Sequence, residues 1–379
     1  MSHARFSWRR LQAVLVKEFI QMRRDRLTFA MMIGVPLMQL VLFGYAINTD
    51  PKSLPTALLA ADQGVFARSL VRALENSEYF EVVRHATSEA EADDLLARGE
   101  VQFVLSIPED FSRELLRGRR PAVLVEADAT DPVATGNALA ALAALNRTAL
   151  AHDLKGPLAS LATAEPAFEL RVHRRYNPEG ATEYNIVPGL IGTILTMTMV
   201  MMTAIAVTRE RERGTMENLL AMPVRPFEVM LGKIVPFVVV GYIQVAVILL
   251  AGRLLFGVPV LGSLWLLSLA LVLFIAANLA VGFTFSTMAE NQLQAMQMTF
   301  FFFLPSLLLS GFLFPFRGMP EWAQVVGSVF PLTHFLRIVR GILLKGSGWS
   351  EVAPEIWPIV AFMVVAGAIA LNRYRETLD

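Results

Sequence analysis

Long apolar runs with few or no charged residues alternate with charged segments along this 379-residue chain. A helix needs about 20 apolar residues to cross the ~30 Å hydrocarbon core of a bilayer. Six runs are candidates, of which the last is short: residues 27–47, 186–207, 234–255, 263–287, 293–314 and 356–371. The pattern predicts a polytopic α-helical membrane protein with six transmembrane helices.

Residues 48–183, between the first two predicted spans, follow a different pattern. Strand-like runs at 56–61, 79–85, 101–107, 122–127 and 168–174 alternate with helix-like runs at 65–76, 88–98, 109–117 and 132–154. Ser88 and Glu91 have the spacing of a capping box, and Pro108 and Gly118 bracket the third helix. The alternation predicts an inserted α/β domain large enough to have its own core.

Two further segments flank the spans. Apolar residues recur at helical spacing in an amphipathic helix within residues 1–26, which we expect in the membrane interface; the alternative is a charge-rich anchor. Residues 315–346 are too apolar for a plain loop. They predict a pair of short helices, broken at Pro320 and Pro331, that re-enter the outer leaflet.

The distribution of Lys and Arg sets the expected orientation. Seven lie in the first 26 residues, five in residues 208–233 and two near the C-terminus. These segments share one side of a six-span protein, so both termini are expected in the cytoplasm and residues 48–183 outside. Four basic residues contradict this rule because they fall on the outer side: Arg317, Arg337, Arg340 and Lys345.

Composition excludes several classes of function. With 55% hydrophobic and 17% charged residues, the chain is too apolar for an ordinary soluble enzyme. Residues 48–183 hold 14 Lys and Arg against 21 Asp and Glu, an acidic balance that argues against nucleic-acid binding. The sequence has no cysteine, no phosphate-binding P-loop motif and no H-E-x-x-H motif. We therefore expect no metal site, no catalytic residues and no ATP hydrolysis by this chain.

The segment 208–233 concentrates charge between two spans. Residues 209–213 alternate Arg and Glu, and Thr215 can cap a short helix that ends before Pro223. One interpretation is a helix on the membrane face that docks with another protein. The other is a tight turn whose charges contact lipid headgroups.

Several motifs resemble the ABC-2 type transporter permeases, in the subgroup with a large external domain after the first span. The main one is RERERGTMENLLAMPVRPFEVMLGKIVPF, from residue 209. Others are NQLQAMQ from 291, FFFLPSLLLSGFLFPFRGMPEW from 301 and PLTHFLRIVRGILLKG from 331. Within or after the external domain, IPEDFSRELLRG, YNPE and VPGLIG are also similar, so the resemblance covers nearly the whole chain.

The resemblance implies a permease that dimerises, with itself or with a second permease, and pairs with a separate ATPase subunit that binds ATP and Mg²⁺. It implies docking through a coupling helix and the interfacial helix, at Glu210, Glu212, Gly214, Thr215, Glu217 and Arg24. No cofactor is expected on this chain itself.

A substrate path is less clearly marked. Flexible methionines suit varied apolar ligands, and membrane-depth amides can line a path; the candidates are Met197, Met201, Gln244, Asn278, Gln294 and Gln297. Each of them is individually explained as well by packing or by hydrogen bonds between helices.

We therefore expect an exporter subunit in a bacterial inner membrane that moves amphipathic, drug-like compounds outward, with membrane lipids around it and a periplasmic adaptor as a possible partner. The alternatives are a lipid or glycoconjugate exporter and, in another class, a membrane-anchored sensor or scaffold whose external domain binds a ligand.

Overall fold

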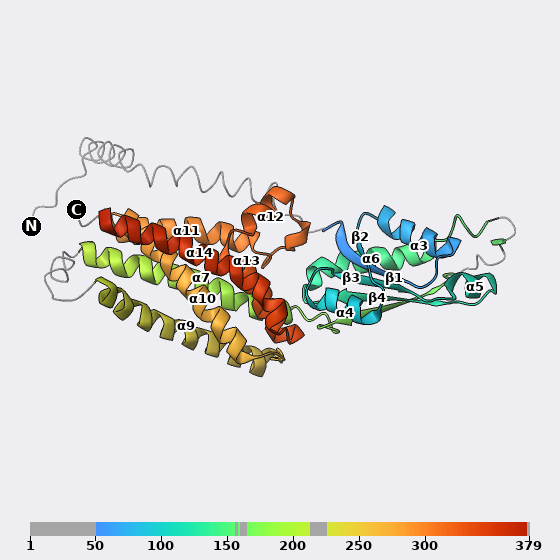
Figure 1. Ribbon diagram of the computed structural model, residues 1–379, viewed down its shortest axis with the longest axis horizontal. Helices are drawn as coiled ribbons and strands as arrows, with labels where there is room; N and C mark the ends of the chain where they lie inside the picture. The colour runs from blue at the N-terminus through green and yellow to red at the C-terminus, as the bar shows by residue number, and fades with distance from the viewer. Residues whose placement is uncertain (1–50, 156–157, 160–164, 213–225, 377–379) are drawn as a thin grey trace, which may run out of the picture.

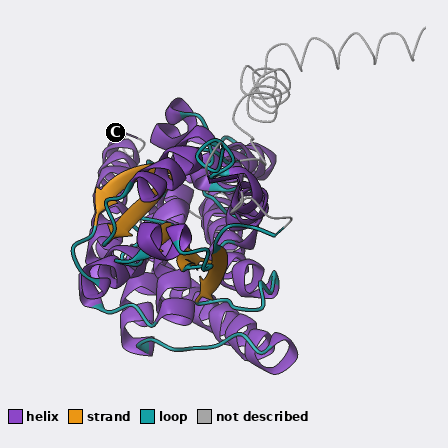
Figure 2. Ribbon diagram, turned by 90° about the vertical axis from the view of Figure 1, so that its right-hand side faces the viewer, coloured by secondary structure: helices purple, strands orange, loops and turns teal. Residues whose placement is uncertain are grey.

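The computed structural model describes residues 51–155, 158–159, 165–212 and 226–376. An α/β region and a bundle of long helices follow one another along the long axis of the molecule (Figure 1). Viewed from the α/β end, the strands lie over the ends of the bundle helices (Figure 2). The chain thus combines an α/β domain with an apolar helical domain, as expected.

The α/β region is built on a five-stranded mixed sheet of order β2-β1-β3-β4-β5. The strands are β1 (Leu54–Ala60), β2 (Phe80–His85), β3 (Phe103–Ile107), β4 (Ala122–Asp128) and β5 (Glu169–Arg175). β1 pairs in parallel with β2 and β3, and β4 with β5, whereas β3 and β4 are antiparallel. All five strands lie within one or two residues of the predicted runs.

Helices cover both faces of this sheet. They are α3 (Val65–Asn76), α4 (Glu89–Ala97), α5 (Phe111–Leu116) and α6 (Pro132–Thr148). Side chains alternate along a strand, so Leu105 packs in one core with α3, α5 and α6, while Val104 packs in a second core with α4. Ser88 caps α4 by accepting a hydrogen bond from the backbone N–H of Glu91, as its spacing predicts.

The second domain contains five described helices that are long and apolar enough to cross a membrane. They are α7 (Glu183–Glu212), α9 (Pro226–Phe256), α10 (Leu264–Met288), α11 (Gln292–Leu309) and α14 (Trp349–Glu376). They coincide with the second to sixth predicted spans. The predicted first span, 27–47, and the predicted interfacial helix within 1–26 lie outside the described residues.

Several helix ends extend beyond the predicted boundaries, whereas α11 ends at Leu309, before the predicted end of the fifth span at 314. α7 continues to Glu212 and α9 begins at Pro226, so part of the predicted loop 208–233 is helical. α14 begins at Trp349, several residues before the predicted sixth span. The extensions arise because uncharged runs measure only the apolar part of a helix, whose ends can continue helically into water. α11 is shorter because the chain turns at Gly311, which has a left-handed φ of 82°.

The segment between α11 and α14 forms short helices, as predicted. They are η3 (Phe316–Gly318), α12 (Glu321–Gly327), α13 (Pro331–Arg340) and η4 (Gly341–Lys345), a single π-helical turn. α12 and the α13–η4 unit are bent by 85° and lie beside the α/β region (Figure 1). The breaks lie at Pro320, the N-cap of α12, and immediately before Pro331, the first residue of α13. Proline is tolerated at the start of a helix but not in its interior, because it has no backbone N–H and its ring clashes with the preceding turn.

Candidate functional site

The end of the bundle far from the sheet carries the described part of the predicted docking residues. Glu212 is exposed at the end of α7, and its carboxylate accepts hydrogen bonds from the backbone N–H (2.8 Å) and side-chain Nε2 (2.5 Å) of Gln292. Arg209 donates from Nε to Oε1 of the same glutamine at 3.4 Å. These contacts join the charged end of α7 to the start of α11.

The structure does not describe the side chains of the other predicted docking residues. Glu210 lies within the backbone of α7, but its side chain is outside the described part. Gly214, Thr215, Glu217 and Arg24 lie outside the described residues. Their role therefore stays a prediction.

The predicted path residues are distributed over four of the helices. Gln244 of α9 accepts a hydrogen bond from the Thr198 hydroxyl of α7 at 3.0 Å. Asn278 is fully buried and donates to the carbonyl of Phe274 on its own helix, and Gln294 accepts from the Glu290 backbone N–H at the start of α11. The remaining three side chains are half-buried: Met197, Met201 and Gln297.

A polar cavity of about 220 Å³ lies where the α/β region meets the bundle, and none of those six residues lines it. From the sheet side it is lined by the end of α4 and the β4–α6 connection. From the bundle side it is lined by the segment after α11, by α13 and η4, and by the start of α14. Segments far apart in the sequence therefore meet there.

A buried ion pair closes one side of this cavity. Lys345 at the end of η4 contacts Asp128 at the end of β4, with 2.5 Å between Nζ and Oδ2, and the two side chains are 11% and 9% exposed. Nζ also donates to the carbonyl of Leu96 at 3.3 Å and lies 5.0 Å from the centre of the Tyr176 ring. One lysine thus connects the bundle to β4, to the end of α4 and to the residue after β5.

The surroundings of Tyr176 show how closed this junction is. Burial, followed by the negative charge of Asp128, raises the pKa of the Tyr176 phenol to about 12. The backbone of Tyr176 has a φ of 68°, a left-handed conformation uncommon for a residue with a side chain. This turn brings the ring over Lys345.

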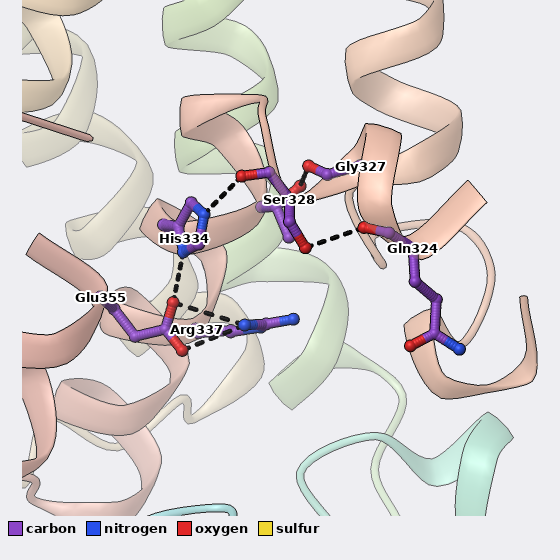
Figure 3. Close-up of polar contacts among 7 residues, drawn as sticks. Gln324, Gly327, Ser328, His334, Arg337 and Glu355 are labelled. Carbon is purple, nitrogen blue, oxygen red and sulfur yellow. Dashed lines mark hydrogen bonds and ion pairs between the residues drawn. The ribbon is translucent and has the colours of Figure 1, made fainter. Parts of the chain in front are cut away.

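A second polar cluster joins α13 to α14 (Figure 3). His334 contacts Glu355 through Nδ1 at 2.5 Å and the Ser328 carbonyl through Nε2 at 2.8 Å. Both ring nitrogens therefore lie within hydrogen-bond distance of an oxygen, one on α14 and one just after α12. Arg337 donates from Nη1 to both oxygens of Glu355 (3.1 and 3.4 Å), and its guanidinium lies 4.7 Å from the centre of the Phe316 ring.

The sequence analysis noted the basic residues of this region without assigning them a role. In the structure, Lys345 and Arg337 are neutralised by carboxylates from β4 and α14. A signal was present in the sequence: His334, Arg337 and Arg340 recur every three residues on one face of α13. That spacing predicts a polar helix face, but not the elements that meet it.

Comparison with known proteins identifies relatives that match nearly the whole chain. A family model described as "ABC-2 family transporter protein" matches residues 26–372. The chain is 28% identical to the probable multidrug ABC transporter permease YbhS of Escherichia coli K12 over 374 residues, covering 97% of this chain and 96% of that protein. It is 28% identical to YbhR of the same organism, a probable multidrug ABC transporter permease (97% and 98% covered), and 29% identical to its inner membrane transport permease YhhJ (90% and 93%). This multi-pass membrane protein belongs to the ABC-2 transporter family.

Proposed function

We propose that this chain is the membrane-spanning permease subunit of an ABC exporter that moves amphipathic or hydrophobic, drug-like compounds outward. The observation that carries the proposal is the match of residues 26–372 to the ABC-2 family, together with the similarity over 97% of the chain to two permeases named as probable multidrug transporters. The apolar helices supply the membrane domain that such a permease needs. Membership of this family does not favour a sensor or scaffold, nor is a lipid or glycoconjugate exporter favoured.

ATP hydrolysis belongs to a separate ATPase subunit, which binds ATP and Mg²⁺ and docks at the cytoplasmic side. The proposed docking surface is the segment 208–233 together with the interfacial helix around Arg24. The Glu212–Gln292 contacts support this placement, because movement imposed on the end of α7 would reach α11 directly. In this arrangement both termini are cytoplasmic and the α/β region lies outside the bacterial inner membrane.

The functional unit has two permease chains, identical or different, and a periplasmic adaptor is a further candidate partner. Within each chain, the cargo passes along the helices that carry Met197, Met201, Gln244, Asn278, Gln294 and Gln297. Methionines adapt their shape to varied apolar ligands at low cost. The amides offer hydrogen bonds to polar groups on the cargo.

The test is reconstitution of this chain with an ATPase encoded beside its gene. We expect a stable complex in detergent, and ATP-dependent movement of a fluorescent amphipathic dye across proteoliposomes. A hydrolysis-deficient ATPase variant is the control, and dye movement should stop with it. Failure to form any complex, with ATPase turnover unchanged by this chain, would contradict the proposal.

A further inference from the structure

We propose that the junction cavity binds the phosphate group of an anionic ligand, and that an anionic phospholipid headgroup at the outer membrane surface supplies it. The assignment goes beyond export, because it concerns a site between the α/β region and the bundle and depends on neither the ATPase nor the cargo. It rests on the charges that line the cavity, on the size of the cavity and on the apolar surface beside it.

The carboxylates that line the cavity already have partners. Asp128 is paired with Lys345, and Glu355 with Arg337 and His334. Asp131 caps α6 by accepting hydrogen bonds from the backbone N–H groups of Val133 (3.1 Å) and Ala134 (3.3 Å). Glu351 accepts from the Gly348 N–H at 2.6 Å and the Ser350 hydroxyl at 2.5 Å.

The basic side chains of the cavity are not balanced in the same way. Arg98, Arg337 and Lys345 each contact a carboxylate. Arg340 and Arg317 also line the cavity, and neither has an ion pair with a described residue. Two arginines thus face the cavity without a carboxylate at ion-pair distance among the described residues.

Arg340 has donors to spare for a ligand. Its Nη1 and Nη2 both donate to the single carbonyl oxygen of Gly311, each at 3.2 Å, and its Nε has no acceptor among the described residues. Asp131 attracts it only from beyond ion-pair distance. A guanidinium in a partly buried site is a strong partner for phosphate oxygens, which accept several hydrogen bonds at once.

The volume of the cavity limits the ligand. About 220 Å³ is below the 300–1,000 Å³ typical of drug-sized ligands, but it holds a phosphate with a small substituent. The lining also includes the apolar side chains of Pro315, Phe316 and Ile338. A small anion attached to an apolar body fits this combination.

The surface next to the cavity indicates where that ligand comes from. α12 follows directly on the lining residues 315–317 and exposes Trp322 (42%), Val325 (68%) and Val326 (43%). An exposed tryptophan with apolar neighbours is typical of a helix at the membrane surface. The cavity therefore lies at headgroup depth, where acyl chains can extend along α12 while the phosphate enters.

The experiment measures binding to the full-length chain in a non-ionic detergent. The probes are the soluble short-chain lipid dihexanoyl-phosphatidylglycerol, its zwitterionic phosphatidylcholine analogue and inorganic phosphate. We expect saturable binding of phosphatidylglycerol, weakened at least about tenfold by Arg340→Gln and by Arg317→Gln, since each removes a charged donor. Arg253→Gln is the matched control, because Arg253 is exposed at the same end of the bundle, on α9, outside the cavity lining.

Comparing the probes and the variants distinguishes a lipid headgroup from free phosphate, and a wrong ligand from a wrong site. Tighter binding of the lipid than of inorganic phosphate supports the headgroup, whereas equal binding of both supports the phosphate site but overturns the lipid source. If Arg340→Gln does not fold, the loss of phosphatidylglycerol binding in Arg317→Gln tests the site instead. Absence of saturable binding by either anion, or an equal loss in Arg253→Gln, would overturn the site itself.

Discussion

At the residue scale, the most consequential contact is the Lys345–Asp128 ion pair, because both charges are withdrawn from water. The Lys52–Glu78 pair of the α/β region provides the contrast: its nitrogen and oxygen are 2.7 Å apart, but its side chains are 47% and 70% exposed. Exposed pairs typically contribute less than about 1 kcal/mol. Removing one partner of a buried pair costs about 3–5 kcal/mol, because the other charge is left without compensation.

We therefore expect Lys345→Met to destabilise the chain by about 3 kcal/mol, measured as a lower unfolding temperature in detergent. Lys52→Met, the matched control, should change stability by less than about 1 kcal/mol. The double variant Lys345→Met with Asp128→Leu should recover much of the loss, since no charge is then buried alone. Equal effects of the two single variants would refute the importance of burial.

At the element scale, the position of α10 at the centre of the bundle depends on close approach to its neighbours. Phe274 of α10 stacks on Phe335 of α13, with ring centres 4.0 Å apart. Gly282 lets α10 approach α7: a Cβ at this position would lie 2.7 Å from the Val200 carbonyl oxygen and 2.7 Å from the Thr203 Cβ. Small residues allow such close approach between apolar helices in a membrane.

We predict that Gly282→Ala costs about 1–3 kcal/mol, because α7 would have to move away from α10. The measurement is the unfolding temperature of the purified chain. Gly367→Ala, in α14, is the control: nothing lies within 4 Å of its added Cβ, so stability should stay the same or rise slightly. An unchanged unfolding temperature in Gly282→Ala would show that the two helices have room to spare.

At the scale of the whole molecule, the two ends of the bundle carry different polar connections. At one end Glu212 and Gln292 join α7 to α11. At the other end Lys345 joins η4 to the sheet, and Glu355 joins α14 to α13. α7 runs from the α/β region to the proposed ATPase surface, so it is one element that can carry movement between them.

In the assembled exporter, Glu217→Lys should uncouple transport from ATP hydrolysis, because it reverses a charge in the proposed docking segment. We expect dye export to fall at least about tenfold, while membrane insertion and basal hydrolysis by the ATPase persist. Arg253→Lys, at the other end of the bundle, is the control and should export normally. Export at the original rate in Glu217→Lys would reject docking through this residue.

The sequence by itself determined the elements of this protein. Hydrophobic periodicity and uncharged runs located five strands and the five described long helices, because burial against a sheet or in lipid requires those patterns. Pro320 and Pro331 marked where the short helices begin, for reasons of backbone geometry alone. The motifs around residues 209–237 indicated the family that the match over residues 26–372 shows.

Only the tertiary structure decided which elements meet. The mixed order of the sheet pairs strands that are not consecutive in the sequence. The ion pair of Lys345 with Asp128 joins residues more than 200 positions apart, for which the local sequence carries no pairing signal. The π-helical turn at 341–345 was not predicted either. The same holds for the junction cavity, whose charge depends on which arginines find carboxylates in space. Periodicity records what each helix must bury, whereas the partner of a buried charge is set by long-range packing.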